Sequence, residues 1–350
     1  PGSPDLLLKS ANGGSRHLKL SLSGLEERHG SYVSPPRASH LMGHRSRCSN
    51  ASSTGEDGGV MDAAGVRDRI VGEVDASDFT AHGVHVLLGE DSAGFLWSAD
   101  RRRDVHSVAK GVCVMAAGIA ADEGLVSWDE PVRTYVPGVL LGRGVEEVTL
   151  RHLLSMTSGI GLAWSETMMT DWPDLAVEFL SRPSSGRVFQ YSNASTYTAM
   201  RVLASVAGDV VQYLVPRLFE PLGIAGVEWE RCPRGYVVAG GGLSLRIEEL
   251  ARIGRLIRDG GRWQGRELVS GEHIEAMHSA WVAAGVNPGY ERYALAGWGG
   301  PGKAWRLHGA YGQLLIFRGD AVVTMSADDH FGADAMASFV VKTLEDHLSA

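Results

Sequence analysis

Cysteine is scarce in this sequence, which excludes several classes of protein at the outset. The 350 residues contain three cysteines, Cys48, Cys113 and Cys232, which are odd in number and far apart. They form no CxxC pair or Cys/His cluster with zinc spacing, and they suggest no disulfide framework. His273 and His278 do not reproduce the HExxH pattern of zinc proteases. We therefore expect no metal and no other cofactor.

Excess positive charge and long apolar runs are also missing. The net charge is −8 and the pI about 5.9, so no basic field attracts the phosphates of a nucleic acid. The run from Arg101 to Arg103 is short and is followed by Asp104, as in a solvated turn. No stretch approaches the roughly eighteen consecutive apolar residues of a membrane helix, and no signal peptide is visible. These absences predict a cytoplasmic protein with no membrane span and no nucleic-acid partner.

The composition changes near residue 60. Residues 1–60 are rich in Ser, Gly, Arg and His, and they carry several Pro and Gly breakers, which predicts a partly disordered extension. The body, residues 61–350, opens with a helical period and a hairpin pattern, and strand patterns return near the C-terminus before a last helix. Helical segments fill the middle. We expect an α+β fold with one sheet built from residues 61–106 and 285–350, and an inserted all-helical lobe over 107–284.

Ser107 and Lys110 are the first chemical candidates. A serine hydroxyl is a poor nucleophile unless a base lies within hydrogen-bond reach. Residues 107–124 predict a helix that is apolar nearly all round, with Ser107 and Lys110 one turn apart on one face. Lys110 is one of five lysines among 33 basic residues, and burying an ammonium here is costly unless it is paired or loses its proton. Alone, S-x-x-K also occurs by chance, and a lysine near a helix end can equally extend into solvent.

Two further segments carry groups that suit acyl transfer. Tyr191 and Asn193 precede another predicted helix, where a tyrosine can relay a proton and an asparagine can orient a carbonyl. An aromatic residue at a helix start and a helix N-cap are the simpler interpretations of these two residues. In RLHGAYG, glycine on a predicted strand indicates close approach of a backbone or ligand, and such an edge can supply an oxyanion N–H. A bulge between two strands is the alternative there.

Taken in order, these motifs resemble one family. Ser-x-x-Lys, Tyr-x-Asn and a glycine-bearing strand near the C-terminus follow each other as in the β-lactamase-related serine hydrolases, most closely the family VIII esterases and 6-aminohexanoate-dimer hydrolases. The segments LRHLLSMTSGIGLAW, FQYSNASTYTAM, RLFEPLGI, GGLSLRIEELARIGRLI and GAYGQ also resemble landmarks of that family, from about residue 61 to the C-terminus. The resemblance implies a central antiparallel sheet flanked by N- and C-terminal helices, beside a helical lobe.

The resemblance also implies roles for single residues. Ser107 is the expected nucleophile, Lys110 its base partner and Tyr191 a second acid/base, while Asn193 orients the substrate. Ser107 and Ala310 are the expected oxyanion donors. The third-motif strand is expected to be Leu307-His308-Gly309, with His308 also orienting the substrate, or His308-Gly309-Ala310 in a shifted register.

The third motif departs from the family pattern, Lys-Thr-Gly, because neither register contains the lysine. In the family that lysine helps to bind a substrate carboxylate, which Leu307 cannot do. Arg306 is a poor substitute because consecutive strand residues point to opposite faces. A neutral ester or amide is therefore the expected substrate.

The pocket and the reaction are less closely defined. Trp164, Trp172 and Trp298 fall in segments that flank the site in relatives, although packing in the core or on the surface explains them equally well. We expect a serine acyl-transfer enzyme that forms acyl-Ser107 and hydrolyses a small ester or amide. A biosynthetic acyltransferase, a β-lactamase or DD-peptidase, and a silent ligand-binding module stay open. A GxSxG hydrolase is excluded because the chain contains no such motif.

Overall fold

The computed structural model describes residues 61–162, 166–167, 172–300 and 302–349. The predicted extension, residues 1–60, and Trp164 lie outside these ranges.

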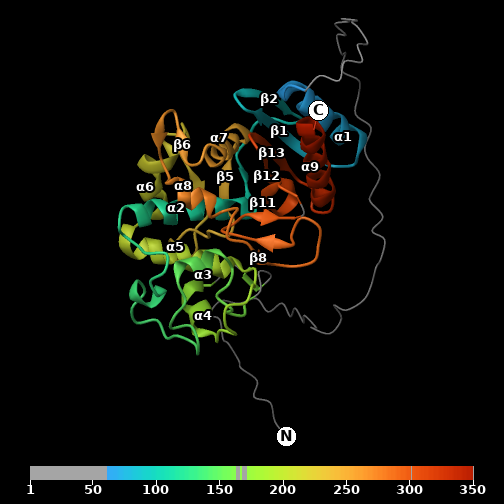
Figure 1. Cartoon of the computed structure of the whole chain (residues 1–350). Helices are drawn as coiled ribbons and strands as arrows, with labels where there is room; N and C mark the ends of the chain where they lie inside the picture. The colour runs from blue at the N-terminus through green and yellow to red at the C-terminus, as the bar shows by residue number, and fades with distance from the viewer. Residues whose placement is uncertain (1–60, 163–165, 168–171, 301, 350) are drawn as a thin grey trace, which may run out of the picture. The chain divides into compact units, whose positions relative to one another are not determined.

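One antiparallel sheet forms the frame of the molecule (Figure 1). It combines strands from the start and the end of the body, so β1 pairs with β13 although some 240 residues separate them. The predicted fold class, α+β with a central antiparallel sheet, is confirmed. In spatial order the strands are β2 (Asp91–Leu96), β1 (Ala81–Leu88), β13 (Ala321–Ala327), β12 (Gln313–Arg318), β11 (Trp305–Gly309), β10 (Trp298–Gly299), β9 (Arg292–Tyr293) and β8 (Val282–Ala283).

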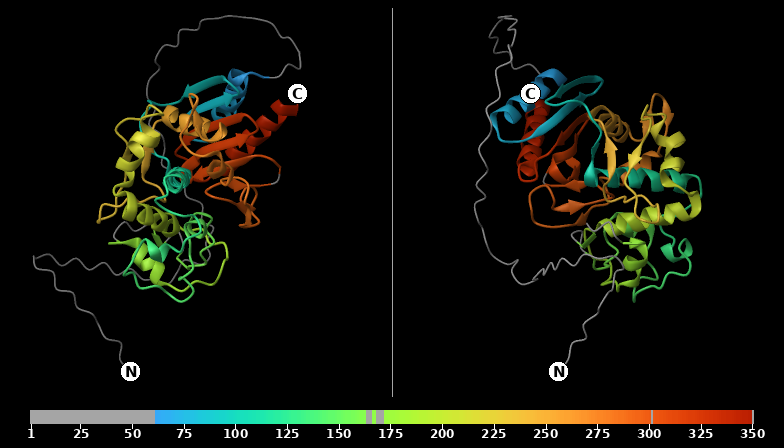
Figure 2. Two further views of the ribbon diagram at one scale, coloured as in Figure 1. Left: turned by 60° about the vertical axis from the view of Figure 1, so that its left-hand side comes forward. Right: turned by 180° about the vertical axis from the view of Figure 1, so that it is seen from behind.

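Two terminal helices cover one face of this sheet. Helix α1 (Ala63–Ala76) begins at Asp62, whose carboxylate accepts from Gly65 N at 2.8 Å, a typical N-cap. Helix α9 (Ala333–Ser349) packs beside it, as the view from behind shows (Figure 2). The side chains of β12 alternate, so Leu314 and Ile316 point into this layer.

The other face carries the larger core. Leu315 and Phe317 of β12 point into it, and helix α7 (Ile247–Arg258) packs against β13 and β1. Helix α2 (Ala109–Asp122) runs through the same core, and all twelve residues from Ala109 to Ala120 are buried. The apolar sequence of α2 thus marks a helix in the interior of the protein.

The middle of the chain forms a mainly helical lobe. Its larger helix, α5 (Asn193–Ala207), packs against α2. In the described ranges no single helix has the length and apolar character of a membrane span, and α5 with the segment Val210–Phe219 meets that test only as a pair bent by 76°. The lobe helices are α3 (Leu150–Leu154), α4 (Leu175–Ser181), α5, α6 (Val210–Leu214) and α8 (Gly271–Glu275).

Short strands also occur in this middle segment, where we expected helices alone. Strands β5 (Leu243–Leu245) and β4 (Glu228–Trp229) of this segment form a small sheet with β3 (Arg103–Asp104), which lies just before the segment in the chain, and β6 (Arg262–Trp263) pairs with β7 (Arg266–Glu267). Strands of two or three residues are too short to show a period in the sequence.

A polar cluster lies between β11 and α9, with Arg306 and His308 largely buried and Asp334 exposed. Tyr290 Oη lies 3.0 Å from His308 Nδ1 and donates to Asp334 Oδ1 at 2.6 Å. Arg306 Nη2 also donates to Asp334, at 3.4 Å, and its guanidinium lies 4.5 Å from the centre of the Tyr290 ring. Burial, with a smaller effect of Arg306, lowers the pKa of His308 to about 4. The imidazole is therefore neutral at physiological pH.

This buried histidine predicts a pH-dependent stability. Its pKa in the folded protein lies below its unfolded value of 6.5, so the native state binds fewer protons than the unfolded state between these values. The free energy of unfolding should fall as the pH drops from about 7 toward 4. Because His308→Gln removes this titration, denaturant unfolding at pH 7 and 4.5 should show a loss smaller by about 1–3 kcal/mol than in the wild type. Equal losses in the two proteins would contradict the assignment.

Candidate active site

Ser107 lies at the entrance of α2, in a short 3₁₀ turn (His106–Val108) that continues directly into the helix. Lys110 follows one turn later and is 2% exposed. Its Nζ donates to Ser107 Oγ at 2.9 Å. The predicted pair is thus brought together, with the amine in a position to receive the hydroxyl proton.

Lys110 Nζ has two further acceptors from distant parts of the chain. It donates to Asn193 Oδ1 at 2.7 Å and to the Gly240 carbonyl at 2.9 Å. An ammonium has three hydrogens, so these two acceptors and Ser107 Oγ can engage all of them. The site therefore stabilises the charged form that results when the amine takes a proton from Ser107.

Tyr191 stands beside this amine. Lys110 Nζ lies 4.9 Å from the centre of the Tyr191 ring. The other contacts of the ring are aromatic, with Trp298 at 5.3 Å and Tyr293 at 5.9 Å between ring centres. Four predicted residues, Ser107, Lys110, Tyr191 and Asn193, therefore converge, although their catalytic roles stay predictions.

Gly240 is a site residue that the sequence analysis missed. Its carbonyl accepts from both Lys110 Nζ and Ser107 Oγ, the latter at 3.4 Å. A Cβ on Gly240 would lie 2.7 Å from side-chain atoms of Asn193, so only glycine allows this segment to approach the start of α5 so closely. The run of three glycines, residues 240–242, was the available signal, since glycine marks close backbone approach.

A second glycine brings the end of β11 to the nucleophile. A Cβ on Gly309 would lie 2.4 Å from the Val105 carbonyl oxygen and 3.2 Å from His106 Cβ. This close approach places Ala310 in the same cavity as Ser107. Both predicted oxyanion donors therefore face one space.

The remaining residues of the third motif point elsewhere. Leu307 is fully buried, and its Cδ1 lies within 2.5 Å of where a Cβ on Gly111 of α2 would stand. His308, predicted to orient the substrate, belongs to the cluster with Tyr290 and Asp334 and does not line the cavity of Ser107. That expectation needs correction, because side-chain alternation along β11 turns His308 toward α9.

The predicted tryptophans also differ in position. Trp172 lines the cavity. Trp298 does not line it, but it supports the Tyr191 ring and contacts Phe189 and Tyr293. Trp298 therefore packs against Tyr191 outside the lining of this cavity.

A cavity of about 520 Å³ opens in front of Ser107. Two carboxylates, Asp104 and Glu230, contribute to its wall, and the described lining includes no arginine or lysine. An apolar side is formed by Trp172, Leu175 and Val238. The described lining residues are Asp104, His106, Ser107, Thr167, Trp172, Leu175, Asn193, Tyr197, Glu230, Cys232, Val238, Gly240, Gly241, Gly242, Ala310, Tyr311 and His330.

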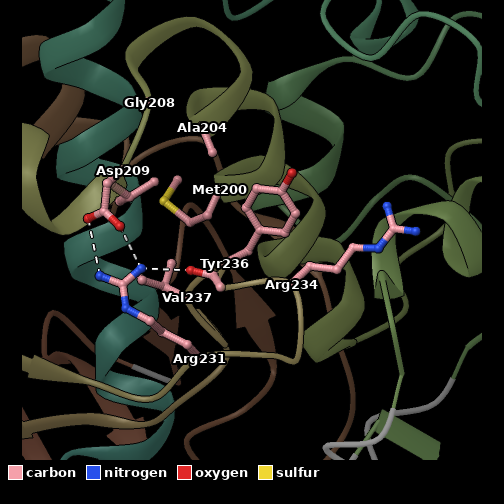
Figure 3. A pocket seen from close by; sticks show the side chains of 10 residues that line it. Met200, Ala204, Gly208, Asp209, Arg231, Arg234, Tyr236 and Val237 are labelled. Carbon is pink, nitrogen blue, oxygen red and sulfur yellow. Dashed lines mark hydrogen bonds and ion pairs between the residues drawn. The ribbon is translucent and has the colours of Figure 1, made fainter.

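A second, smaller hollow of about 250 Å³ lies behind the segment 231–237 (Figure 3). Arg231 spans it and donates to Asp209 Oδ2 at 2.6 Å and to the Gly235 carbonyl at 2.7 Å. Cys232 and Val238 of the same segment line the Ser107 cavity. This ion pair therefore anchors a segment that forms part of the wall of the Ser107 cavity.

One group of metal-binding side chains occurs in the described ranges, at Asp122, Glu272 and His273. Asp122 ends α2, about 20 Å along the helix from Ser107 at 1.5 Å per residue. Its carboxylate already accepts from Ser270 at 2.7 Å and lies 2.9 Å from His273 Nε2. These contacts fasten α8 to α2, so the group takes no part in the site at Ser107.

Comparison with known proteins supports the resemblance seen in the motifs. A curated relative, 6-aminohexanoate-dimer hydrolase of Paenarthrobacter ureafaciens, is 27% identical over 224 residues, which are 56% of this chain and 55% of the relative. The chain thus spans about half the length of that relative.

Solved structures share the fold at low sequence identity. D-amino acid amidase from Ochrobactrum anthropi has a TM-score of 0.62 at 14% identity, over 80% of this chain and 97% of that chain. The octameric penicillin-binding protein homologue from Pyrococcus abyssi has a TM-score of 0.64 at 18% identity, over 81% and 78%. The family model described as Beta-lactamase matches residues 79–338. Since this match covers well over half of the sequence, the chain belongs to the β-lactamase family.

Proposed function

We propose that this protein is a serine hydrolase that forms a covalent acyl-Ser107 intermediate and cleaves a neutral ester or amide. The single observation that carries the proposal is the 2.9 Å contact between Lys110 Nζ and Ser107 Oγ at the start of an apolar, buried helix. Attack of Oγ on a carbonyl carbon transfers the hydroxyl proton to Lys110, and the ammonium formed has acceptors on Asn193 and Gly240. The names of the relatives, a hydrolase and an amidase, favour water as the acyl acceptor.

The oxyanion formed in this attack needs donors that are already in place. The backbone N–H groups of Ser107 and Ala310 are the candidates, because both residues line the cavity and Gly309 holds their segments together. We expect Tyr191, whose ring centre lies 4.9 Å from Lys110 Nζ, to relay a proton through Lys110 to the leaving group.

The charge of the cavity wall supports an uncharged acyl donor. The two carboxylates, Asp104 and Glu230, oppose a substrate carboxylate. Arg306 is 5% exposed and is bound to Asp334. Leu307 fills the space beside Gly111, so this strand presents no cation to a penicillin-like ligand.

Covalent labelling tests the nucleophile. A fluorophosphonate should add to wild-type protein with a mass gain that maps to Ser107, because the reagent captures an activated serine. Ser107→Ala should remain unlabelled under the same conditions, while Ser155→Ala, which changes a half-buried serine outside the cavity, should label as the wild type does. Absence of an adduct in the wild type, or equal labelling of Ser107→Ala, would overturn the proposal.

A matched set of p-nitrophenyl esters tests the charge selection. The two esters compared have acyl chains of the same length that end in a carboxamide or in a carboxylate. The carboxamide ester should have a kcat/KM higher by about tenfold or more. Glu230→Gln should narrow this ratio, because it removes one negative charge from the wall. Glu146→Gln, which removes the same charge from an exposed position outside the cavity, should leave the ratio unchanged. Equal turnover of the two esters, or rapid nitrocefin hydrolysis, would contradict the neutral-substrate assignment.

A further inference from the structure

Two residues with left-handed backbone bracket the candidate oxyanion hole. His106, directly before Ser107, has a φ of 48°, and Tyr311, directly after Ala310, has a φ of 61°. Their rings lie 5.2 Å apart between centres. Such conformations are uncommon outside glycine and cluster at functional sites. The surrounding structure must therefore hold both residues in place.

Asp104 is the group that holds His106. Its Oδ1 accepts from His106 N at 2.7 Å and from Gly242 N at 2.8 Å. These two bonds tie the turn before the nucleophile to the glycine-rich segment whose Gly240 carbonyl accepts from Lys110. One carboxylate oxygen thus connects the turn that carries Ser107 to the segment that binds its base partner, Lys110.

The other oxygen of Asp104 acts on the His106 ring. Oδ2 lies 3.3 Å from His106 Nδ1, and a carboxylate at this nitrogen favours the tautomer with hydrogen on Nδ1. The lone pair then resides on Nε2, for which the described residues supply no hydrogen-bond partner. The His106 side chain is 33% exposed, and the residue lines the cavity. A free basic nitrogen therefore accompanies the nucleophile in this space.

The position of Tyr191 favours another residue as the base that activates water in deacylation. Its ring packs against Trp298 and Tyr293 beside Lys110, and Tyr191 is not among the residues that line the cavity. We expect the water that attacks acyl-Ser107 to enter from this cavity, whose described lining includes His106 but not Tyr191.

We propose that His106 is the general base of deacylation, with Asp104 as its positioning residue; this inference rests on the proposed acyl-Ser107 intermediate. The oxygen of a water molecule bonds to the acyl carbonyl carbon while one of its protons passes to His106 Nε2. The tetrahedral intermediate then collapses. The bond between the carbon and Ser107 Oγ breaks, and His106 returns the proton to that oxygen, which regenerates the serine and releases the carboxylic acid.

Pre-steady-state kinetics with p-nitrophenyl acetate test this step. The burst of p-nitrophenolate reports acylation, and the decay of acyl-Ser107, followed by intact mass after rapid gel filtration, reports deacylation. His106→Asn tolerates the left-handed backbone but lacks the base. We expect an acylation rate within about threefold of the wild type and a deacylation rate lower by about 100-fold or more, so that acyl-Ser107 accumulates.

The Asp104→Asn variant tests the same step in a different way, because it changes the tautomer of His106 and leaves the imidazole in place. Asparagine Oδ1 can keep both backbone bonds, while its NH₂ group would donate to Nδ1 and move the ring hydrogen to Nε2. We expect the same selective loss of deacylation. His82→Asn, on β1 and outside the cavity, is the matched control and should decay at the wild-type rate.

The outcomes separate this inference from the proposed function. A wild-type protein that forms no adduct on Ser107 would refute the proposed function itself. A normal adduct that decays at the wild-type rate in His106→Asn would refute the inference alone. Equal slowing of acylation and deacylation in both variants would also refute it, because His106 would then only position the oxyanion hole, which serves both steps.

Discussion

The site depends on a single buried amine with three acceptors. Lys110 projects from the interior helix α2 and is 2% exposed, where an unpaired ammonium would cost several kcal/mol. Its partners are Ser107 in the turn before this helix, Asn193 at the start of α5 and the Gly240 carbonyl. The lobe, the nucleophile turn and the glycine-rich segment must all be in place before the amine has these partners. The packing that gives the buried amine its acceptors therefore also holds it beside Ser107.

The rest of the site is formed where backbone segments from distant parts of the chain approach each other closely. At Gly240 and Gly309 a single added carbon would lie within 3 Å of a neighbouring segment. Glycine is therefore required at both positions, because Gly240 approaches Asn193 and Gly309 approaches the turn that carries Ser107. The left-handed residues His106 and Tyr311 lie at the same junction, and Asp104 bonds to the backbone there. A carbonyl substrate would meet groups that are already fixed, as electrostatic stabilisation of an oxyanion requires.

Much of this arrangement could be predicted from the sequence. Helical spacing and the scarcity of lysine drew attention to Ser107 and Lys110, and the strand patterns at both ends of the body predicted the sheet. Tyr191 and Asn193 became specific candidates through the family resemblance, because each alone has a simpler structural explanation.

Other parts of the site could not be predicted. Gly240 contributes a carbonyl, which every residue possesses, so its role depends on a tertiary approach. The orientation of His308 follows from its place in the alternation of β11, and a motif by itself does not reveal which face of a strand meets the nucleophile. Asp104 contacts Gly242 and His106 contacts Tyr311, and both of these partners are far away in the sequence.

The most direct test of the account is the acylation rate of a Lys110→Met variant with p-nitrophenyl acetate. Methionine keeps an unbranched chain in α2 but removes the amine, and circular dichroism can verify that the variant remains folded. The account predicts an acylation rate lower than that of the wild type by about 100-fold or more. A folded variant that acylates Ser107 within a few-fold of the wild-type rate would contradict it, because the serine would then be activated by another group.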